Sequence, residues 1–263
     1  MRLYLVPFLL FCSASFAETP FRDCNACPEM VVLPGGTYLK GSPQDEPGRS
    51  ADVRNHDEDD LAGPGGAQVS VTVAAFALGT HEITNREFSL FVSETAYEMR
   101  GGCIADLHRD GRYQPYPEAT WNHTGRRFDD ALPASCIDWD AARAYTEWLS
   151  RRTGKRYRLP TESEFEYARR AGSTTTYHFG TDPEQLCRYG NVPDASLKAV
   201  APVLTTLACD DGYWDLAPVG QFEPNALGIY DITGNVWEWL VDCYEDSYAN
   251  APVDGSALIE VGS

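Results

Sequence analysis

The stretch NALGIYDITGNVWEW, residues 225–239, decides how the rest of the chain is interpreted. Asp231 and Glu238 flank a tight turn centred on Gly234 and Asn235. Such a turn points main-chain carbonyls inward, and the two carboxylates complete a set of oxygen ligands. Six to eight oxygen ligands are what Ca²⁺ takes in proteins. The same spacing also fits a structural interpretation, in which Asp231 caps the turn and the two tryptophans fill the core.

Three helices are predicted from their capping residues. The first begins after Thr84 and the third after Thr161, and in both a glutamate three positions on completes a capping box. The second follows Asp138 and ends at Gly154. The third is expected to close at Gly172.

Strand signals are short. Residues 30–38 predict a strand, a turn and a second strand, and residues 69–73 alternate with the period of a half-buried strand. Residues 42–67 predict an exposed loop with residues 57–60 as its acidic tip. The expected fold class is therefore α+β, with little regular secondary structure and disulfides as braces.

Four segments resemble the formylglycine-generating enzyme (sulfatase-modifying factor) family. They are MVVLPGG at 30–36, DWDAARAY at 138–145, RYRLPTESEFEYA at 156–168, and the stretch 225–239. They occur in family order and together cover residues 30–239. The resemblance implies a fold related to C-type lectins, with two calcium sites.

The resemblance also implies the ligands of those sites. One site would use the side chains of Asp231 and Glu238 and the carbonyls of Gly234 and Val236. The other would use the side chains of Asn191 and Asp211 and the carbonyls of Val192 and Tyr213. Trp237 would lie near the substrate cleft, although core packing is the ordinary role for it and for Trp121 and Trp214.

The activity implied by the resemblance is oxidation of a protein cysteine to formylglycine by molecular oxygen. Family enzymes bind Cu⁺ with two cysteines in a segment beyond the tryptophan turn, because soft thiolates suit Cu⁺. Here the residues after Trp239 include one cysteine, Cys243. We therefore expect the C-terminal part of the domain to be missing or its active site to be lost, with Cu⁺ bound only if a further segment supplies two cysteines. Whether the chain is an enzyme stays open, and the alternative is a non-catalytic lectin-like module binding a peptide, glycan or cell-wall ligand.

The remaining candidates for chemistry are weak. Five histidines are scattered along the chain without spacing suited to iron or zinc, and His81 beside Glu82 is interpreted as a strand-end residue. A protein or peptide substrate is the partner that the resemblance implies. The sequence predicts no oligomeric state.

The N-terminus predicts export. Residues 1–17 have the positive start, apolar run and small cleavage residues of a signal peptide, residues 18–28 form a linker, and residues 29–263 form the domain. No later stretch is apolar enough for a membrane span, so a secreted or periplasmic protein is expected. The formal net charge of −18 disfavours nucleic acid as a partner.

Disulfides are expected in such a compartment. One of the eight cysteines lies in the signal peptide, and local order suggests how six of the others pair. The expected pairs are Cys24 with Cys27, Cys103 with Cys136, and Cys187 with Cys209. Cys243 is left as a free thiol, an intermolecular bridge, or the partner of a cysteine outside this chain.

Overall fold

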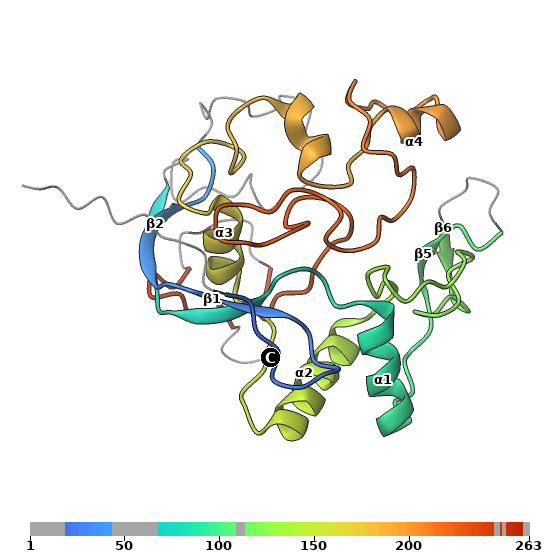
Figure 1. The fold of residues 1–263 in the computed structure, drawn as a ribbon, viewed down its shortest axis with the longest axis horizontal. Coiled ribbons are helices and arrows are strands. Elements are labelled where there is room, and N and C mark those ends of the chain that lie inside the picture. Colours follow the sequence, from blue (N-terminus) through green and yellow to red (C-terminus); the bar gives the residue numbers. More distant parts are fainter. Residues whose placement is uncertain (1–18, 44–67, 109–113, 245–247, 249–250, 260–263) are drawn as a thin grey trace, which may run out of the picture.

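Short helices and strands are joined by long stretches of irregular backbone (Figure 1). The computed structural model describes residues 19–43, 68–108, 114–244, 248 and 251–259. The predicted signal peptide and the acidic loop tip at 57–60 lie outside these residues. The strands are β1 (Met30–Leu33), β2 (Gly36–Lys40), β3 (Val69–Val73), β4 (Phe76–Gly79), β5 (Cys103–Ala105) and β6 (Gln114–Tyr116), and the helices are α1 (Asn85–Thr95), α2 (Trp139–Thr153), α3 (Glu162–Arg170), a 3₁₀ helix (Pro183–Arg188) and α4 (Ala195–Val200).

The described strands form three antiparallel pairs. The predicted strand–turn–strand at 30–38 is confirmed, but its two strands do not pair with each other: β1 pairs with β4 and β2 pairs with β3. The chain passes from one pair to the other at Gly35. A Cβ at Gly35 would lie 2.8 Å from both the Val73 carbonyl oxygen and the Ala75 nitrogen, so the close approach of the strands requires glycine here. The strands β4, β5 and β6 were not predicted.

All three predicted helices form, and their N-termini are where the capping residues placed them. Thr84 and Thr161 each make a complete capping box, and the Asp138 side chain accepts from the Ala141 N–H. The predicted end of α3 at Gly172 is wrong, because the helix ends earlier, at Arg170. Ala171 already adopts the left-handed conformation (φ 47°) and donates to the Tyr167 carbonyl, which ends the helix at Arg170.

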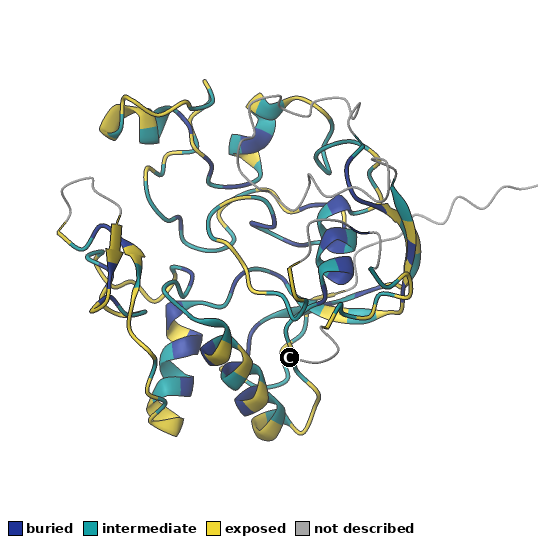
Figure 2. Ribbon diagram, turned by 180° about the vertical axis from the view of Figure 1, so that it is seen from behind, coloured by how far each residue is buried: buried dark blue, intermediate teal, exposed yellow. Residues whose placement is uncertain are grey.

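The first core cluster lies between α1 and α2, whose buried faces are visible from behind in Figure 2. Phe91 contacts four other rings, those of Phe88, Tyr97, Tyr145 and Trp148. Trp121 packs edge-on against Phe88, as its ordinary role predicted. Cys27 is fully buried in the same cluster and ties the N-terminal segment to it.

The second core cluster holds the decisive stretch in place. Its members come from β1, α3 and residues 227–232, namely Val31, Leu33, Ala168, Leu227, Ile229 and Ile232. The side chain of Asn225 donates to the Ala168 carbonyl at 2.7 Å, which adds a polar anchor beside these apolar contacts. The turn at 231–238 therefore projects from a rigid base.

The three predicted disulfides are present, with Cα–Cα distances of 5.0, 5.4 and 6.1 Å for the pairs Cys24–Cys27, Cys103–Cys136 and Cys187–Cys209. Cys243 is a free, exposed thiol. Within the described residues, no helix is both long and apolar enough to cross a membrane.

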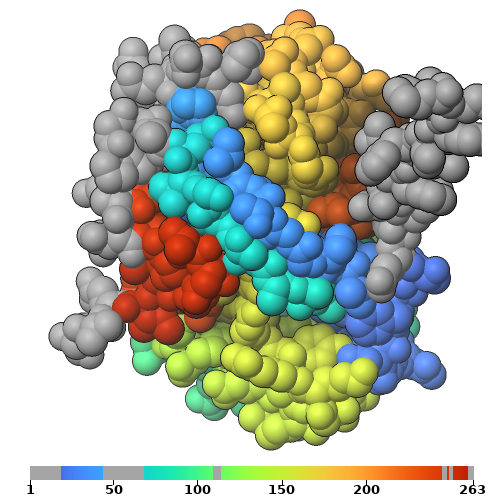
Figure 3. All heavy atoms as spheres, turned by 90° about the vertical axis from the view of Figure 1, so that its left-hand side faces the viewer, coloured from blue at the N-terminus to red at the C-terminus, as the bar shows by residue number. Residues whose placement is uncertain are grey.

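The last described segment packs against the β2–β3 pair (Figure 3). The Thr72 N–H donates to the Val253 carbonyl at 2.9 Å, and the Cys243 N–H donates to the Leu258 carbonyl at 2.8 Å. Beneath it, buried Lys40 forms a 2.6 Å ion pair with Glu162. The Glu162 N–H donates to Asp242 Oδ2 at 2.8 Å, so the described residues of this segment are joined both to β3 and to α3.

Replacing Phe91 with alanine should cost about 3–5 kcal/mol of the free energy of unfolding, because it leaves a cavity among four aromatic rings. The matched control is Val203→Ala, since Val203 is 91% exposed. That variant should change stability by less than about 0.5 kcal/mol. Denaturant unfolding measures both, and equal effects would contradict the proposed core.

Candidate functional site

The turn at 231–238 uses backbone conformations that few residues tolerate. Asp231 (φ 54°) and Asn235 (φ 56°) both adopt the left-handed conformation, and Gly234 lies at φ 112°. Asp and Asn are the non-glycine residues that visit this region most readily, because their short polar side chains bond locally. Their polar groups are thereby directed into the protein.

The Asn235 side-chain amide connects three separate parts of the chain. Its Nδ2 donates to Glu82 Oε1 at 3.0 Å and to the Ala217 carbonyl at 3.2 Å. Its Oδ1 accepts from the Ala217 N–H at 3.0 Å and from Asn191 Nδ2 at 3.3 Å. The full hydrogen-bonding capacity of the amide is used, so the turn has one defined position.

Two buried carboxyl groups meet beside this amide. Asp231 is 2% exposed and Glu82 is 6% exposed, and the two side chains lie within hydrogen-bonding reach of each other. Asp231 Oδ2 accepts from the Gly220 N–H at 2.6 Å. Asp231 Oδ1 and Glu82 Oε2 are buried and receive no donor. Two such oxygens call for a shared proton or a cation, because an unpaired buried charge is costly.

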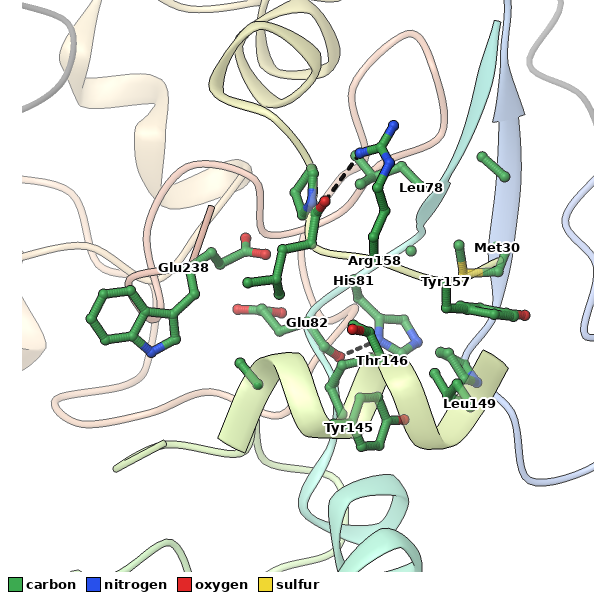
Figure 4. A pocket seen from close by; sticks show the side chains of 18 of the residues that line it. Met30, Leu78, His81, Glu82, Tyr145, Thr146, Leu149, Tyr157, Arg158 and Glu238 are labelled. Carbon is green, nitrogen blue, oxygen red and sulfur yellow. Dashed lines mark hydrogen bonds between the residues drawn. The ribbon is translucent and has the colours of Figure 1, made fainter. Parts of the chain in front are cut away.

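A third carboxylate, from Glu238, completes the acidic group. Glu238 is exposed as a residue, yet its carboxylate points back toward that of Glu82 (Figure 4). Loss of water around this carboxyl group and the negative charge of Asp231 raise the pKa of Glu238 to about 7. Burial, followed by the charges of Glu238 and Asp231, raises the pKa of Glu82 to about 9. Burial also raises the pKa of Asp231.

Glu82 and Glu238 open into a cleft of about 500 Å³. Its walls carry apolar and aromatic side chains together with polar ones; Met30, Leu78, Tyr145, Leu149 and Tyr157 are among those labelled in Figure 4. His81 also lines the cleft, and its Nδ1 contacts the Glu82 carbonyl at 2.8 Å.

Trp237 lies at this cleft and is 99% exposed. Trp239 lines it too, is half-exposed, and is held by a 2.7 Å hydrogen bond from its indole N–H to the Ile137 carbonyl. The interpretation in which both tryptophans fill the core is therefore wrong. Ile232, near the start of the turn, is buried in the second core cluster, whereas the side chain of Trp237 lies in solvent.

The residues of the second predicted ligand set also lie close together, but their side chains already make hydrogen bonds with main-chain groups. The Asp211 carboxylate accepts the N–H groups of Val192 and Tyr213, both at 2.8 Å. Asn191 Nδ2 donates to the Asp215 carbonyl. Both Asp211 oxygens thus already have donors. Asp194 and the Cys187 sulfur lie close to Asp211, but that sulfur belongs to a disulfide and offers no thiolate.

The two predicted ligand sets pack directly against each other. A Cβ at Gly190 would lie 1.9 Å from the Thr233 carbonyl oxygen, and a Cβ at Gly234 would lie 2.4 Å from the Asn191 carbonyl oxygen. The Asn235 N–H donates to that same Asn191 carbonyl at 2.8 Å. The loops at 190–192 and 233–236 therefore form one unit.

Glu82 is the residue of this site that sequence reasoning missed. It lies between β4 and the Thr84 cap, and nothing in the local pattern links it to a turn about 150 positions later. The local signal was weak. Glu82 lies between an apolar strand and a helix cap, and no amphipathic helix or strand there would place its carboxylate in solvent.

Loop-dominated architecture, three disulfides and a left-handed acidic turn at the floor of a cleft define a class of α+β proteins built around a fixed loop core. Residues 16–262 match the family described as the sulfatase-modifying factor enzyme 1-like domain (FGE-sulfatase). The chain belongs to this family, as the four collinear motifs predicted.

The similar proteins include one that is named as an enzyme and one that is named as inactive. The formylglycine-generating enzyme of Mycobacterium tuberculosis is 32% identical over 244 residues, covering 80% of this chain and 73% of that protein. The mouse protein named inactive Cα-formylglycine-generating enzyme 2 is 31% identical over 246 residues, covering 83% of this chain and 70% of that protein. Among solved structures, PvdO from Pseudomonas aeruginosa superimposes with a TM-score of 0.71 at 36% identity, covering 92% of this chain and 81% of PvdO.

In metal-free protein, the free energy of unfolding should fall as the pH rises from about 5 to 9. The folded state holds the Glu82 proton up to a pKa of about 9, whereas the unfolded state releases it near 4.5, so the folded state binds more protons throughout this range. Chemical unfolding in chelator at several pH values measures the slope.

Glu82→Gln should reduce this slope, because the amide does not titrate, and the raised pKa values of Glu238 and Asp231 account for what remains. Glu118→Gln is the control, since Glu118 is exposed. A wild-type stability that rises over the same pH range would contradict the buried carboxyl group.

Proposed function

We propose that this chain is an exported formylglycine-generating-enzyme-family protein that binds a protein or peptide chain in its cleft. The observation that carries the proposal is the fully exposed indole of Trp237 beside a cleft of about 500 Å³. Exposed tryptophans at the edge of a preformed cleft are typical anchors for a partner chain. The rigid base under the turn keeps this anchor in position without a bound partner.

We further propose that Ca²⁺ is held by the side chains of Asp231 and Glu238, with the carbonyls of Gly234 and Val236. The buried oxygens without donors on Asp231 and Glu82 support this, because the group fits a hard cation that prefers oxygen ligands. When bound, Ca²⁺ would neutralise the carboxylates and hold the turn. The set of Asn191, Val192, Asp211 and Tyr213 remains a proposed second site, with weaker support because both Asp211 oxygens already accept main-chain N–H groups.

Copper-dependent oxidation of a cysteine needs two thiolates for Cu⁺. Six of the described cysteines are paired in disulfides, and the remaining described cysteine, Cys243, is a free thiol. The described residues therefore do not fit a Cu⁺ site, and no oxidation step is assigned to them. The name of the inactive mouse relative supports a role for this fold that does not depend on the oxidation.

Export fits this role. Three disulfides among the described residues are characteristic of proteins in an oxidising compartment. The predicted signal peptide at residues 1–17 supports the same location.

Chelation of calcium should lower the melting temperature by about 5–10 °C relative to protein with the ion at a hundredfold excess over its dissociation constant. Glu238→Gln should reduce this shift, because it removes a charged ligand. Glu223→Gln is the control, as Glu223 is an exposed glutamate in a surface ion pair with Arg188 and does not line the cleft. Identical transitions with and without calcium would refute the proposed site.

Trp237→Ala should weaken binding of a fluorescent peptide containing Cys-x-Pro-x-Arg by at least about tenfold, since buried tryptophan anchors contribute 2 kcal/mol or more. Trp214→Ala is the control, because Trp214 is also exposed and does not line the cleft. Fluorescence anisotropy measures both.

The same peptide with copper and oxygen should yield no aldehyde with this 263-residue chain. Aldehyde detected by mass spectrometry would show that the chain is an oxidase. If a glycan array binds and the peptide does not, the cleft serves a carbohydrate and the proposed substrate class is wrong.

A further inference from the structure

The N-terminal disulfide has the C-x-x-C spacing found in redox-active proteins. Cys24 and Cys27 close a turn in which the Cys27 N–H donates to the Cys24 carbonyl at 3.0 Å. Residues 25 and 26 between them are exposed. Cysteines at this spacing are among those whose thiolates are stabilised, which favours exchange.

The two cysteines differ in accessibility. Cys27 is fully buried in the first core cluster, whereas Cys24 is only partly buried at its edge. Thiol–disulfide exchange needs one sulfur that an incoming thiolate can reach and a second that leaves and stays nearby. This pair meets both conditions, with Cys24 as the accessible member.

The disulfide borders the cleft. Asp23 precedes Cys24, Pro28 follows Cys27, and both line the cleft together with Phe21. A chain bound in the cleft would therefore pass close to the disulfide. Neither Cys24 nor Cys27 is itself a lining residue, and Cys136 also has neighbours in the lining, Ala134 and Ile137.

Two cationic side chains contact the segment that carries the pair. Arg22 Nη1 donates to the Cys27 carbonyl at 2.7 Å, and Lys155 Nζ lies 3.2 Å from Asp23. Cationic groups stabilise a departing thiolate. Asp23, Glu29 and Glu87 partly offset them, because Arg22 also lies 3.5 Å from each glutamate.

The disulfide also has little to contribute as a brace. Its cysteines are three positions apart, compared with 33 for Cys103–Cys136 and 22 for Cys187–Cys209. In the chain-entropy account, a disulfide stabilises less as the loop it closes becomes shorter. The shortest loop therefore has the weakest structural reason for its cross-link.

We infer that Cys24–Cys27 is a redox-active disulfide that exchanges with a thiol carried by the protein or peptide chain in the cleft. The substrate thiolate attacks Cys24 Sγ and forms a mixed disulfide, while the S–S bond breaks and Cys27 leaves as a thiolate, which then takes up a proton. A second substrate thiol, once deprotonated, attacks the mixed disulfide and releases the reduced pair. The substrate dithiol becomes a disulfide, and Cys24–Cys27 becomes two thiols. The location of the substrate rests on the proposed function; the exchange chemistry of the pair does not.

The first test titrates the whole protein, in a Cys243→Ser background that prevents shuffling, with graded mixtures of reduced and oxidised glutathione. Free thiols are trapped by alkylation at each step and assigned by peptide mass mapping. Cys24 and Cys27 should become reduced while the pairs Cys103–Cys136 and Cys187–Cys209 stay oxidised and the protein stays folded. Reduction of all three pairs together, or of Cys24–Cys27 only on unfolding, would assign the disulfide a purely structural role.

The second test traps the intermediate. Cys27→Ser should leave Cys24 able to form a mixed disulfide with a cysteine-containing peptide, whereas the matched Cys209→Ser variant, which leaves Cys187, should react at least about tenfold more slowly. Equal rates for Cys24 and Cys187 would refute the assignment. If Cys24–Cys27 exchanges with glutathione and Trp237→Ala leaves peptide binding unchanged, the redox inference holds and the cleft proposal fails. The reverse pattern separates the two in the other direction.

Discussion

The arrangement of the site depends on the side-chain amide of Asn235. Through four hydrogen bonds it ties the turn at 231–238 to Glu82, Asn191 and Ala217. These partners come from regions that share no strand or helix. In a protein with so little regular secondary structure, main-chain ladders cannot fix such loops, so side-chain amides and carboxylates take over that task. The left-handed backbone at Asn235 and Asp231 is the local cost of directing both side chains inward.

The same geometry concentrates negative charge where water is scarce. Asp231 and Glu82 are both buried, and Glu238 adds its charge from the cleft side. Such a group is stable only with protons or a cation among its oxygens. The group of Asp231, Glu82 and Glu238 is therefore the part of the fold most sensitive to pH and to cations. The first and second core clusters are less sensitive to either. Trp237 lies on the turn beside the acidic group, and its side chain is exposed to solvent.

Features that depend on neighbouring residues could be predicted from the sequence. The helix starts at Thr84, Asp138 and Thr161 follow from capping groups within three positions, and the disulfides followed from local order. Features that depend on distant segments could not. Glu82 meets Asp231 because the segment after β4 brings it next to the turn, and the exposure of Trp237 depends on the path of residues 233–238 beyond the buried Ile232. The C-terminal end of α3 and the short strands β5 and β6 are set by contacts too small to leave a period in the sequence.

The contact between Gly190 and Gly234 limits how this scaffold can be re-engineered. Because each glycine leaves room for the carbonyl of the opposite loop, neither Gly190 nor Gly234 can take a side chain unless the opposite loop moves. Grafting would therefore have to transfer both loops together.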